Sequence, residues 1–278
     1  MKFSLIAATV GRVEEFERFL ESLERQTYRD FTLLVVDQNL DDRLTPLIAR
    51  FGKRFDVRHL RSERGLSRAR NVALAHVTGD VVAFPDDDCI YPPDLLERIA
   101  SLFASRPDVD GVSGRCLTPE GAPRGRWPSS GARITKYNIF GRCISFTMFL
   151  RRALVDRIGA FDETLGLGAN TPWLGAEDYD YLLRAALQGS GVYYDPGIVV
   201  VHPGLTTAYS ALDRLKRHGN ALGFGRFLAK HHYSLAFVTY YSGRYLAGAA
   251  FNFATGRIAK AYYRWTTLVG NLEGWFAT

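Results

Sequence analysis

Short, continuously apolar runs alternate with segments of helical periodicity through residues 1–204, and this alternation limits the fold more than any other feature. Runs such as Phe31–Val36 and Val81–Phe84 have the length and composition of strands that are buried on both faces. The intervening segments carry apolar residues at helical spacing, as Val13–Arg25 does. The alternation predicts a mostly parallel sheet with helices on both faces and with ligands at the carboxyl ends of the strands.

The same patterns predict the extent of each element. Strands are expected at Phe3–Ala8, Phe31–Val36, Val57–Leu60, Val81–Phe84, Ile144–Leu150, Gly191–Tyr194 and Ile198–Val201. Helices are expected at Val13–Arg25, Leu44–Phe51, Leu66–His76, Leu95–Phe103, Ala153–Ile158 and Glu177–Leu187. Residues 119–135 are rich in Gly, Pro and Ser and are predicted to form a surface loop, and the chain is predicted to be helical from Leu205 onward.

Three consecutive aspartates, Asp86, Asp87 and Asp88, follow one of the predicted strands. Like charges held together repel one another and lose solvation, so such a cluster is a poor way to stabilise a fold. Mg²⁺ and Mn²⁺, by contrast, prefer carboxylate ligands together with substrate phosphate oxygens. The cluster therefore favours a divalent-cation site, and the alternative is an acidic turn that caps the helix following Pro92-Pro93-Asp94.

Other ionisable residues stand at positions where a nucleotide or a metal could bind. Asp37 ends a predicted strand and could accept hydrogen bonds from a nucleobase or ribose, or it could cap the next helix. His202 also ends a strand and could be a further metal ligand or an ordinary core residue. Arg70, in the first turns of a predicted helix, could approach a bound diphosphate or could be a solvated side chain.

The acidic segment Glu177–Asp180 begins the helix that follows a glycine-rich stretch. Carboxylates favour a helix N-terminus, so capping accounts for part of this pattern. Three acids within four residues exceed what capping requires. One of them, held in an occluded pocket, could take a proton from an acceptor hydroxyl.

The net charge of +6 conceals a strong asymmetry along the chain. Residues 205–278 contain nine Lys and Arg against two acids, a net charge of +7, and 15 of the aromatic residues. Basic, aromatic-rich helices are typical of membrane interfaces, although this region could instead pack on the catalytic core or form a homo-oligomer contact. Arg244 interrupts the apolar stretch Tyr233–Thr255, which makes a spanning helix a poor alternative. No recognisable nucleic-acid-binding module accompanies the charge.

The cysteines and the N-terminus bear on the cellular compartment. Cys89, Cys116 and Cys143 are odd in number and lack CxxC spacing, which argues for a reducing compartment and against a disulfide framework or a structural zinc. The N-terminal MKFSLIAATVGR lacks the apolar region and the cleavage site of a signal peptide, so we expect it to form the first strand.

Six segments, taken together and in order, resemble the family 2 glycosyltransferases, which have the nucleotide-sugar-binding GT-A fold. The segments are LIAATVGR, SLERQTYRDFTLLVVDQN, GLSRARNVALAHVTGDVVAFPDDDCIYPPDLL, GAFDETLGLG, GAEDYDYLLRAALQG and VVVHP. The resemblance implies an α/β GT-A catalytic domain over residues 1–204. The remaining residues, 205–278, would form a helical, basic and aromatic-rich appendage that associates with a membrane or packs on the domain.

The resemblance also implies roles for individual residues. Asp86 and Asp88 would form the D-x-D motif, and the ligands of Mn²⁺ or Mg²⁺ would be Asp86, Asp88 and His202. The residues that would bind the nucleotide are Ala8, Thr9, Asp37, Arg70, Asp86 and Asp87. Asp178 would be the general base, with Glu177 beside it in the E-D motif.

The implied reaction is an inverting transfer of one sugar from a nucleotide-diphosphate sugar to an acceptor hydroxyl. The acceptor would be a lipid-linked saccharide in polysaccharide or glycolipid biosynthesis, and the enzyme would associate peripherally with the cytoplasmic face of the inner membrane. A non-catalytic nucleotide-sugar-binding or membrane scaffold protein would tolerate loss of the acids, which are all present here. A sugar nucleotidyltransferase would need a Gly-rich, Lys-containing phosphate loop, of which Ala8–Arg12 is a poor version.

Overall fold

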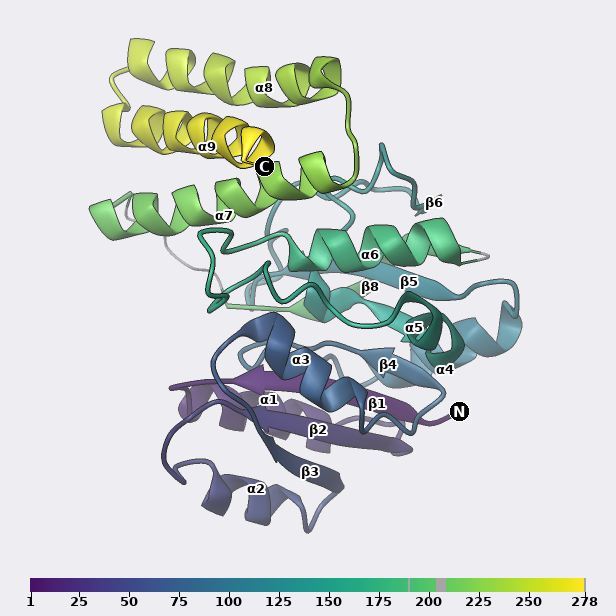
Figure 1. Ribbon diagram of the computed structural model, residues 1–278. Helices are drawn as coiled ribbons and strands as arrows, with labels where there is room; N and C mark the ends of the chain where they lie inside the picture. The colour runs from purple at the N-terminus through teal and green to yellow at the C-terminus, as the bar shows by residue number, and fades with distance from the viewer. Residues whose placement is uncertain (190, 204–208, 278) are drawn as a thin grey trace. The chain divides into compact units, whose positions relative to one another are not determined.

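A computed structural model describes residues 1–189, 191–203 and 209–277 of the chain (Figure 1). They fall into two compact units, each described separately below. The first unit is Met1–Arg64, Arg68–Phe161 and Tyr181–Gly204, and the second is Gly65–Ser67, Asp162–Asp180 and Leu205–Thr278. The domain boundary predicted between residues 204 and 205 lies outside the described residues.

The first unit is built on an eight-stranded sheet with the order β3-β2-β1-β4-β7-β5-β8-β6. The strands are β1 (Phe3–Thr9), β2 (Phe31–Asp37), β3 (Asp56–Arg61), β4 (Val81–Ala83), β5 (Gly111–Leu117), β6 (Ala132–Arg133), β7 (Phe149–Arg151) and β8 (Val192–Val201). β7 runs antiparallel to β4 and β5, β6 runs antiparallel to β8, and the other pairs are parallel. The predicted mostly parallel sheet is confirmed.

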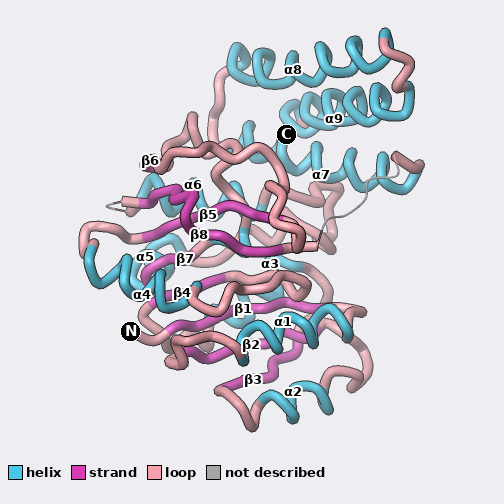
Figure 2. The backbone as a smooth tube through the Cα atoms, turned by 180° about the vertical axis from the view of Figure 1, so that it is seen from behind, coloured by secondary structure: helices cyan, strands magenta, loops and turns pink. Residues whose placement is uncertain are grey.

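Helices cover both faces of this sheet, as the opposite views in Figures 1 and 2 show. One face carries α1 (Glu14–Glu24), α2 (Thr45–Phe51) and α4 (Leu95–Ser105). The other face carries α5 (Arg152–Ile158) and those parts of α3 (Leu66–Leu74) and α6 (Glu177–Gln188) that belong to the first unit. Burial of both faces explains why β1, β2 and β4 have continuously apolar sequences.

Two strands of the sheet were not expected from the sequence. β5 contains Gly111, Gly114 and polar residues, so it lacks the apolar pattern of the other central strands. It forms because β7 and β8 pair with its two edges. β6 lies within the predicted loop 119–135 and pairs with the start of β8.

Two predicted strand boundaries are wrong. In the segment predicted as a strand over Ile144–Leu150, Ser145–Thr147 form a short 3₁₀ helix, and only the residues from Phe149 onward pair in the sheet. The two strands predicted at Gly191–Tyr194 and Ile198–Val201 are one strand, β8. Its pairing with β5 continues on both sides of a register shift, which allows the strand to pass through Asp195-Pro196-Gly197.

The second unit contains three long helices, α7 (Ala211–Lys230), α8 (Leu235–Ala254) and α9 (Ile258–Phe276). Gly274 of α9 lies so close to the backbone of Leu222 on α7 that a Cβ atom there would collide with it. The predicted helical character is confirmed from Ala211 onward, while Leu205–Ala208 lie outside the described residues. Within the described ranges, no helix combines the length and the apolar composition needed to cross a bilayer.

Phe84, directly after β4, anchors the start of the aspartate loop in the core. Its side chain is fully buried, with ring centroids 5.1 Å from Phe161 and 5.4 Å from Tyr181. Phe84→Ala is expected to lower the free energy of unfolding by about 3–5 kcal/mol, measured by denaturant titration, because it leaves a cavity. The matched change Phe251→Ala, at a side chain that is 62% exposed, should cost less than about 0.5 kcal/mol. Equal losses at both positions would contradict this account.

Candidate functional site

The parallel strands of the first unit place several candidate residues at one edge of the sheet. Thr9 ends β1 and pairs in register with Asp37 at the end of β2. The aspartates Asp86–Asp88 follow β4, which pairs with the other side of β1. β1 is therefore flanked by β2 and β4, and such a reversal of strand order is where open α/β sheets bind their ligands. Ala8 is half-buried at this edge, and Thr9 is 1% exposed.

A two-residue bridge brings His202 to the aspartates. Ile90 and Val201 exchange backbone hydrogen bonds of 2.7 and 3.0 Å, which join the segment after Asp88 to the end of β8. The backbone N–H of His202 also donates to the carbonyl oxygen of Leu117 on β5, at 2.9 Å. The segment at Ile90 and the strand β5 therefore fix the position of His202.

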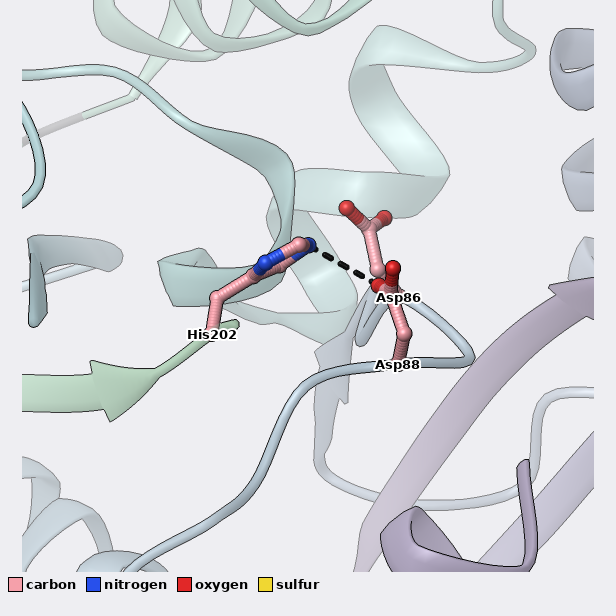
Figure 3. A group of neighbouring side chains, drawn as sticks. All are labelled: Asp86, Asp88 and His202. Atoms are coloured by element: carbon pink, nitrogen blue, oxygen red, sulfur yellow. Dashed lines mark ion pairs between the residues drawn. The ribbon is translucent and has the colours of Figure 1, made fainter. Parts of the chain in front are cut away.

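Asp86, Asp88 and His202 form a cluster in which the candidate ligand atoms all lie within 4.8 Å of one another. Figure 3 shows the imidazole of His202 directed toward the aspartates. Nε2 of His202 lies 2.8 Å from Oδ1 of Asp88, a buried oxygen that accepts no hydrogen bond of good geometry from any described residue. Two carboxylates and an imidazole are suitable ligands for Mn²⁺, and the carboxylates also suit Mg²⁺. These residues therefore fit a divalent cation.

The imidazole of His202 is held from its other side. Nδ1 lies 2.9 Å from the carbonyl oxygen of Pro203, and Arg124 contacts Nδ1 and donates to the same carbonyl oxygen at 2.9 Å. The ring of Phe146 lies beside the imidazole, with centroids 5.0 Å apart. A metal ligand requires the tautomer in which Nδ1 carries the proton and donates it to Pro203, so that the lone pair of Nε2 faces the cation site. In that tautomer the contact between Arg124 and Nδ1 is not a hydrogen bond, and Arg124 is held by the carbonyl oxygen of Pro203.

Arg12, which stands in no acidic or metal-binding motif of the sequence, contacts two of the three aspartates. Its guanidinium lies 2.6 Å from Oδ1 of Asp87 and 2.7 Å from Oδ2 of Asp88. Burial raises the pKa of Asp87 to about 6, although Arg12 and Thr9 act in the opposite direction. Burial also acts to raise the pKa of Asp88, but His202 and Arg12 outweigh it and the pKa is lowered. Arg12 therefore offsets part of the repulsion between the acids.

Asp37 is completely buried, and other residues of the protein contact both of its oxygens. Oδ1 accepts hydrogen bonds from the backbone and the side chain of Asn39, at 2.9 and 2.8 Å. Oδ2 lies 2.9 Å from Nε2 of His59 and 3.1 Å from the guanidinium of Arg61. Asp37 thus orients Asn39, His59 and Arg61, and of these only Asn39 stands in a sequence segment that resembles the family.

Arg70 is buried rather than solvated, so the alternative of a solvated side chain is wrong. The side chain is 1% exposed, and its guanidinium lies 3.5 Å from Oδ1 of Asp86. The same group lies over the ring of Phe161, 5.2 Å from its centroid. Arg70 therefore provides positive charge beneath the aspartate loop.

The acids of the Glu177–Asp180 segment have different surroundings within the second unit. Asp180 is completely buried and pairs with Lys230 at 2.7 Å and with His231 at 2.9 Å. Glu177 and Asp178 are half-buried, and Oδ1 of Asp178 accepts a hydrogen bond of 2.8 Å from the backbone N–H of Tyr179. The preceding Ala176 has a φ angle of 69°, which is uncommon for a residue other than glycine and is typical of functional segments. The two ion pairs of Asp180 give it a structural role, and Glu177 and Asp178 differ from it in being partly exposed.

Comparison with known proteins identifies the family. The sequence matches the profile of "Glycosyl transferase family 2" over residues 4–158. The glucosyl-dolichyl phosphate glucuronosyltransferase of Haloferax volcanii is 34% identical over 118 residues, which are 41% of this chain and 38% of that protein. The uncharacterized glycosyltransferase YwdF of Bacillus subtilis is 26% identical over 193 residues, which are 67% of this chain and 68% of that protein.

Solved structures show the same fold. The mannosyltransferase PcManGT from Pyrobaculum calidifontis, solved in complex with GDP-Man and Mn²⁺, matches with a TM-score of 0.66 at 18% identity. The match covers 98% of this chain and 87% of that one. Since the family profile covers more than half of the sequence, the chain belongs to glycosyl transferase family 2, and the structural match shows that it has the GT-A fold.

Proposed function

We propose that this protein is a metal-dependent, inverting glycosyltransferase that moves one sugar from a nucleotide-diphosphate sugar to an acceptor hydroxyl. The cluster of Asp86, Asp88 and His202 beside the end of β1 is the observation that carries the proposal. Family membership supports sugar transfer as the reaction. The GDP-Man and Mn²⁺ bound to PcManGT support the class of donor and the need for a cation.

The nucleotide would bind along the ends of β1 and β2. Ala8 and Thr9 would line its pocket, and the buried Asp37 would act through the polar side chains that it orients. Asp86 and Asp87 would lie at the ribose and diphosphate end, above Arg70. The guanidinium of Arg12, which is 43% exposed, could turn from the acids to the diphosphate, because phosphate oxygens match its planar fork of donors.

The reaction would divide between two groups of residues. Asp86, Asp88 and His202 would hold Mn²⁺ or Mg²⁺, which supplies positive charge for the departing diphosphate. Asp178, with Glu177 beside it, would take the proton of the acceptor hydroxyl. The freed oxygen attacks the anomeric carbon opposite the diphosphate, the bond from carbon to the diphosphate oxygen breaks, and the configuration inverts. Orientation of donor and acceptor by the protein would account for a large share of the rate, about 7–11 kcal/mol in well-aligned cases.

We infer a lipid-linked saccharide as the acceptor, reached from the cytoplasmic surface of the membrane. The name of the Haloferax volcanii relative includes a dolichyl phosphate carrier, which supports this class of acceptor. The basic and aromatic helices of the second unit are also suited to a membrane surface. Such an enzyme would act in polysaccharide or glycolipid biosynthesis.

The proposal can be tested by following labelled sugar from a panel of UDP-, GDP- and dTDP-sugars into a membrane lipid extract. We expect transfer to the lipid fraction from one donor, lost on chelation and restored by Mn²⁺ or Mg²⁺. Transfer that continues in the presence of a chelator would contradict the role of the cation. Transfer only to water-soluble acceptors would contradict the class of acceptor.

His202→Ala is expected to weaken Mn²⁺ binding by about 10- to 100-fold or more, because even the loss of a residue that orients a ligand has an effect of this size. Mn²⁺ binding can be measured by titration with electron paramagnetic resonance. His218→Ala is a matched control, since His218 lies on α7 and pairs with Glu273 instead. Unchanged Mn²⁺ affinity in the folded His202→Ala variant would exclude this residue as a ligand.

A further inference from the structure

A pocket of about 300 Å³ in the second unit is lined by basic and aromatic side chains. Its lining includes three cations, Arg217 from α7 and Lys260 and Arg264 from α9. Tyr245 of α8 and Tyr263 of α9 also line it. The pocket shares none of its residues with the cluster of Asp86, Asp88 and His202.

Neutral groups contact two of the three cations in this pocket. Nε of Arg217 donates to Oγ1 of Thr267 at 2.7 Å, and its guanidinium lies 5.5 Å from the ring centroid of Tyr263. The guanidinium of Arg264 lies 6.0 Å from the ring centroid of Tyr245. All three cations are half-buried, so their positions are more restricted than those of cations on an open surface.

Among the residues that the structure describes, none supplies a negative charge to the pocket. Within the described part of the chain, no carboxylate lies within ion-pair distance of Arg217, Lys260 or Arg264. The sequence contains no Asp or Glu at all between Asp213 and Glu273. Like charges gathered without a counter-ion repel one another, and a bound anion would relieve this repulsion.

A phosphate ester matches the donors that the pocket offers. A guanidinium can bind two phosphate oxygens at once, and a lysine adds a compact positive charge. Tyrosine and threonine hydroxyls can donate further hydrogen bonds. A phosphate monoester carries about −1.5 to −2 charges at pH 7, which three cations in one pocket can balance.

Two of the three helices that line the pocket, α8 and α9, also expose apolar side chains, which points to a lipid as the carrier of the phosphate. Leu246 and Phe253 of α8, with Tyr262 and Trp265 of α9, are 50–68% exposed and line a second hollow of about 380 Å³. Leu246 follows Tyr245, and Tyr262 and Trp265 flank Tyr263 and Arg264, so the pocket and the apolar residues share the same helical turns. Aromatic and apolar groups beside cations are the composition of helices that lie in a membrane interface.

We propose that the pocket formed by Arg217, Lys260 and Arg264 binds the phosphate group of an anionic membrane lipid and so docks the second unit on the bilayer. The inference rests on the proposed function in one respect, which is that the protein acts at a membrane. It adds a specific lipid-binding site to the general attraction of basic helices for membranes.

Flotation of the full chain with phosphatidylcholine vesicles, with or without phosphatidic acid, tests the proposal. Wild type should float only with phosphatidic acid. Arg264→Gln and Lys260→Gln should each weaken this binding by about tenfold or more, because each removes a charge-assisted contact in a half-buried site. Arg257→Gln is the charge-matched control, since Arg257 is exposed and lies outside the pocket, and it should weaken binding by about fivefold or less.

Several results would overturn the proposal. An equal loss in all three variants would indicate diffuse attraction without a pocket, and equal binding to neutral vesicles would indicate apolar insertion alone. Protection of the pocket by inorganic phosphate, without vesicle binding, would exclude the lipid. Thermal melting shows whether each variant is folded. Lys260→Gln should not destabilise α9, because Lys260 is a cation in the first turn of the helix, where the helix dipole is unfavourable to positive charge. Nucleotide-sugar binding, measured separately, distinguishes failure of this inference from failure of the transferase proposal.

Discussion

Asp88→Asn is expected to lower the turnover number for sugar transfer by about two to three orders of magnitude, even at saturating metal. Oδ1 of Asp88 faces Nε2 of His202, and Oδ2 faces Arg12. The amide removes a negatively charged ligand and weakens the pairing of this side chain with the guanidinium of Arg12. A loss of this size is typical when one group that stabilises developing charge is removed. Steady-state transfer assays with a fixed donor and acceptor measure it.

Asp87→Asn is the matched control for that experiment. It removes the same charge from the adjacent residue, which pairs with Arg12 but does not belong to the metal-binding cluster. We expect turnover to fall by about tenfold or less, because Asp87 would affect only the nucleotide and Arg12. Equal losses at both positions, with both variants folded, would contradict the separate role assigned to Asp88.

Asp178→Asn should lower the turnover number by about 10²- to 10⁴-fold while the donor affinity changes by no more than about twofold. An amide cannot take the acceptor proton, and removal of a general base has an effect of this size. Its oxygen can still accept the hydrogen bond from the backbone N–H of Tyr179, so the start of α6 should keep its conformation. Turnover and donor affinity are measured separately, by transfer assays and by calorimetry.

Asp180→Asn provides the contrast within the same acidic segment. Asp180 is completely buried between Lys230 and His231, so its replacement should lower stability by about 3–5 kcal/mol, the usual cost of breaking a buried ion pair. The fraction that remains folded should keep most of its turnover. A greater catalytic loss at Asp180 than at Asp178 would reverse the two assignments.

The strands and helices around the site could be predicted wherever burial itself determined the sequence pattern. β1, β2 and β4 are buried on both faces, so their apolar runs identify them directly. β5 could not be predicted in this way, because Gly111 and Gly114 interrupt any apolar run or alternation in its sequence. Its pairing with β7 and β8, which the sequence does not show, stabilises it as a strand. β8 was predicted as two strands, because Pro196 and Gly197 within it are residues that normally form a turn.

In the candidate site, too, some residues could be predicted from the sequence and others could not. Asp86–Asp88 could be recognised from their place after a strand, whereas their association with His202 depends on the bridge between Ile90 and Val201. Arg12 stands in no acidic or metal-binding motif, and its pairing with Asp87 becomes evident only in the folded chain. Tertiary contacts between distant segments create these relations, and local spacing in the sequence does not record them.

Donor binding tests the central claim most directly. Thermal melting of wild type and Asp88→Asn would be followed with UDP-, GDP- and dTDP-sugars, each with and without Mn²⁺. A ligand that binds only the folded state raises its stability by about RT ln(1 + [L]/Kd). We predict a shift with one donor in wild type that requires Mn²⁺ and is absent in Asp88→Asn. No shift with any donor in the folded wild-type protein, or an equal shift in both proteins, would contradict a metal-dependent nucleotide-sugar site at this cluster.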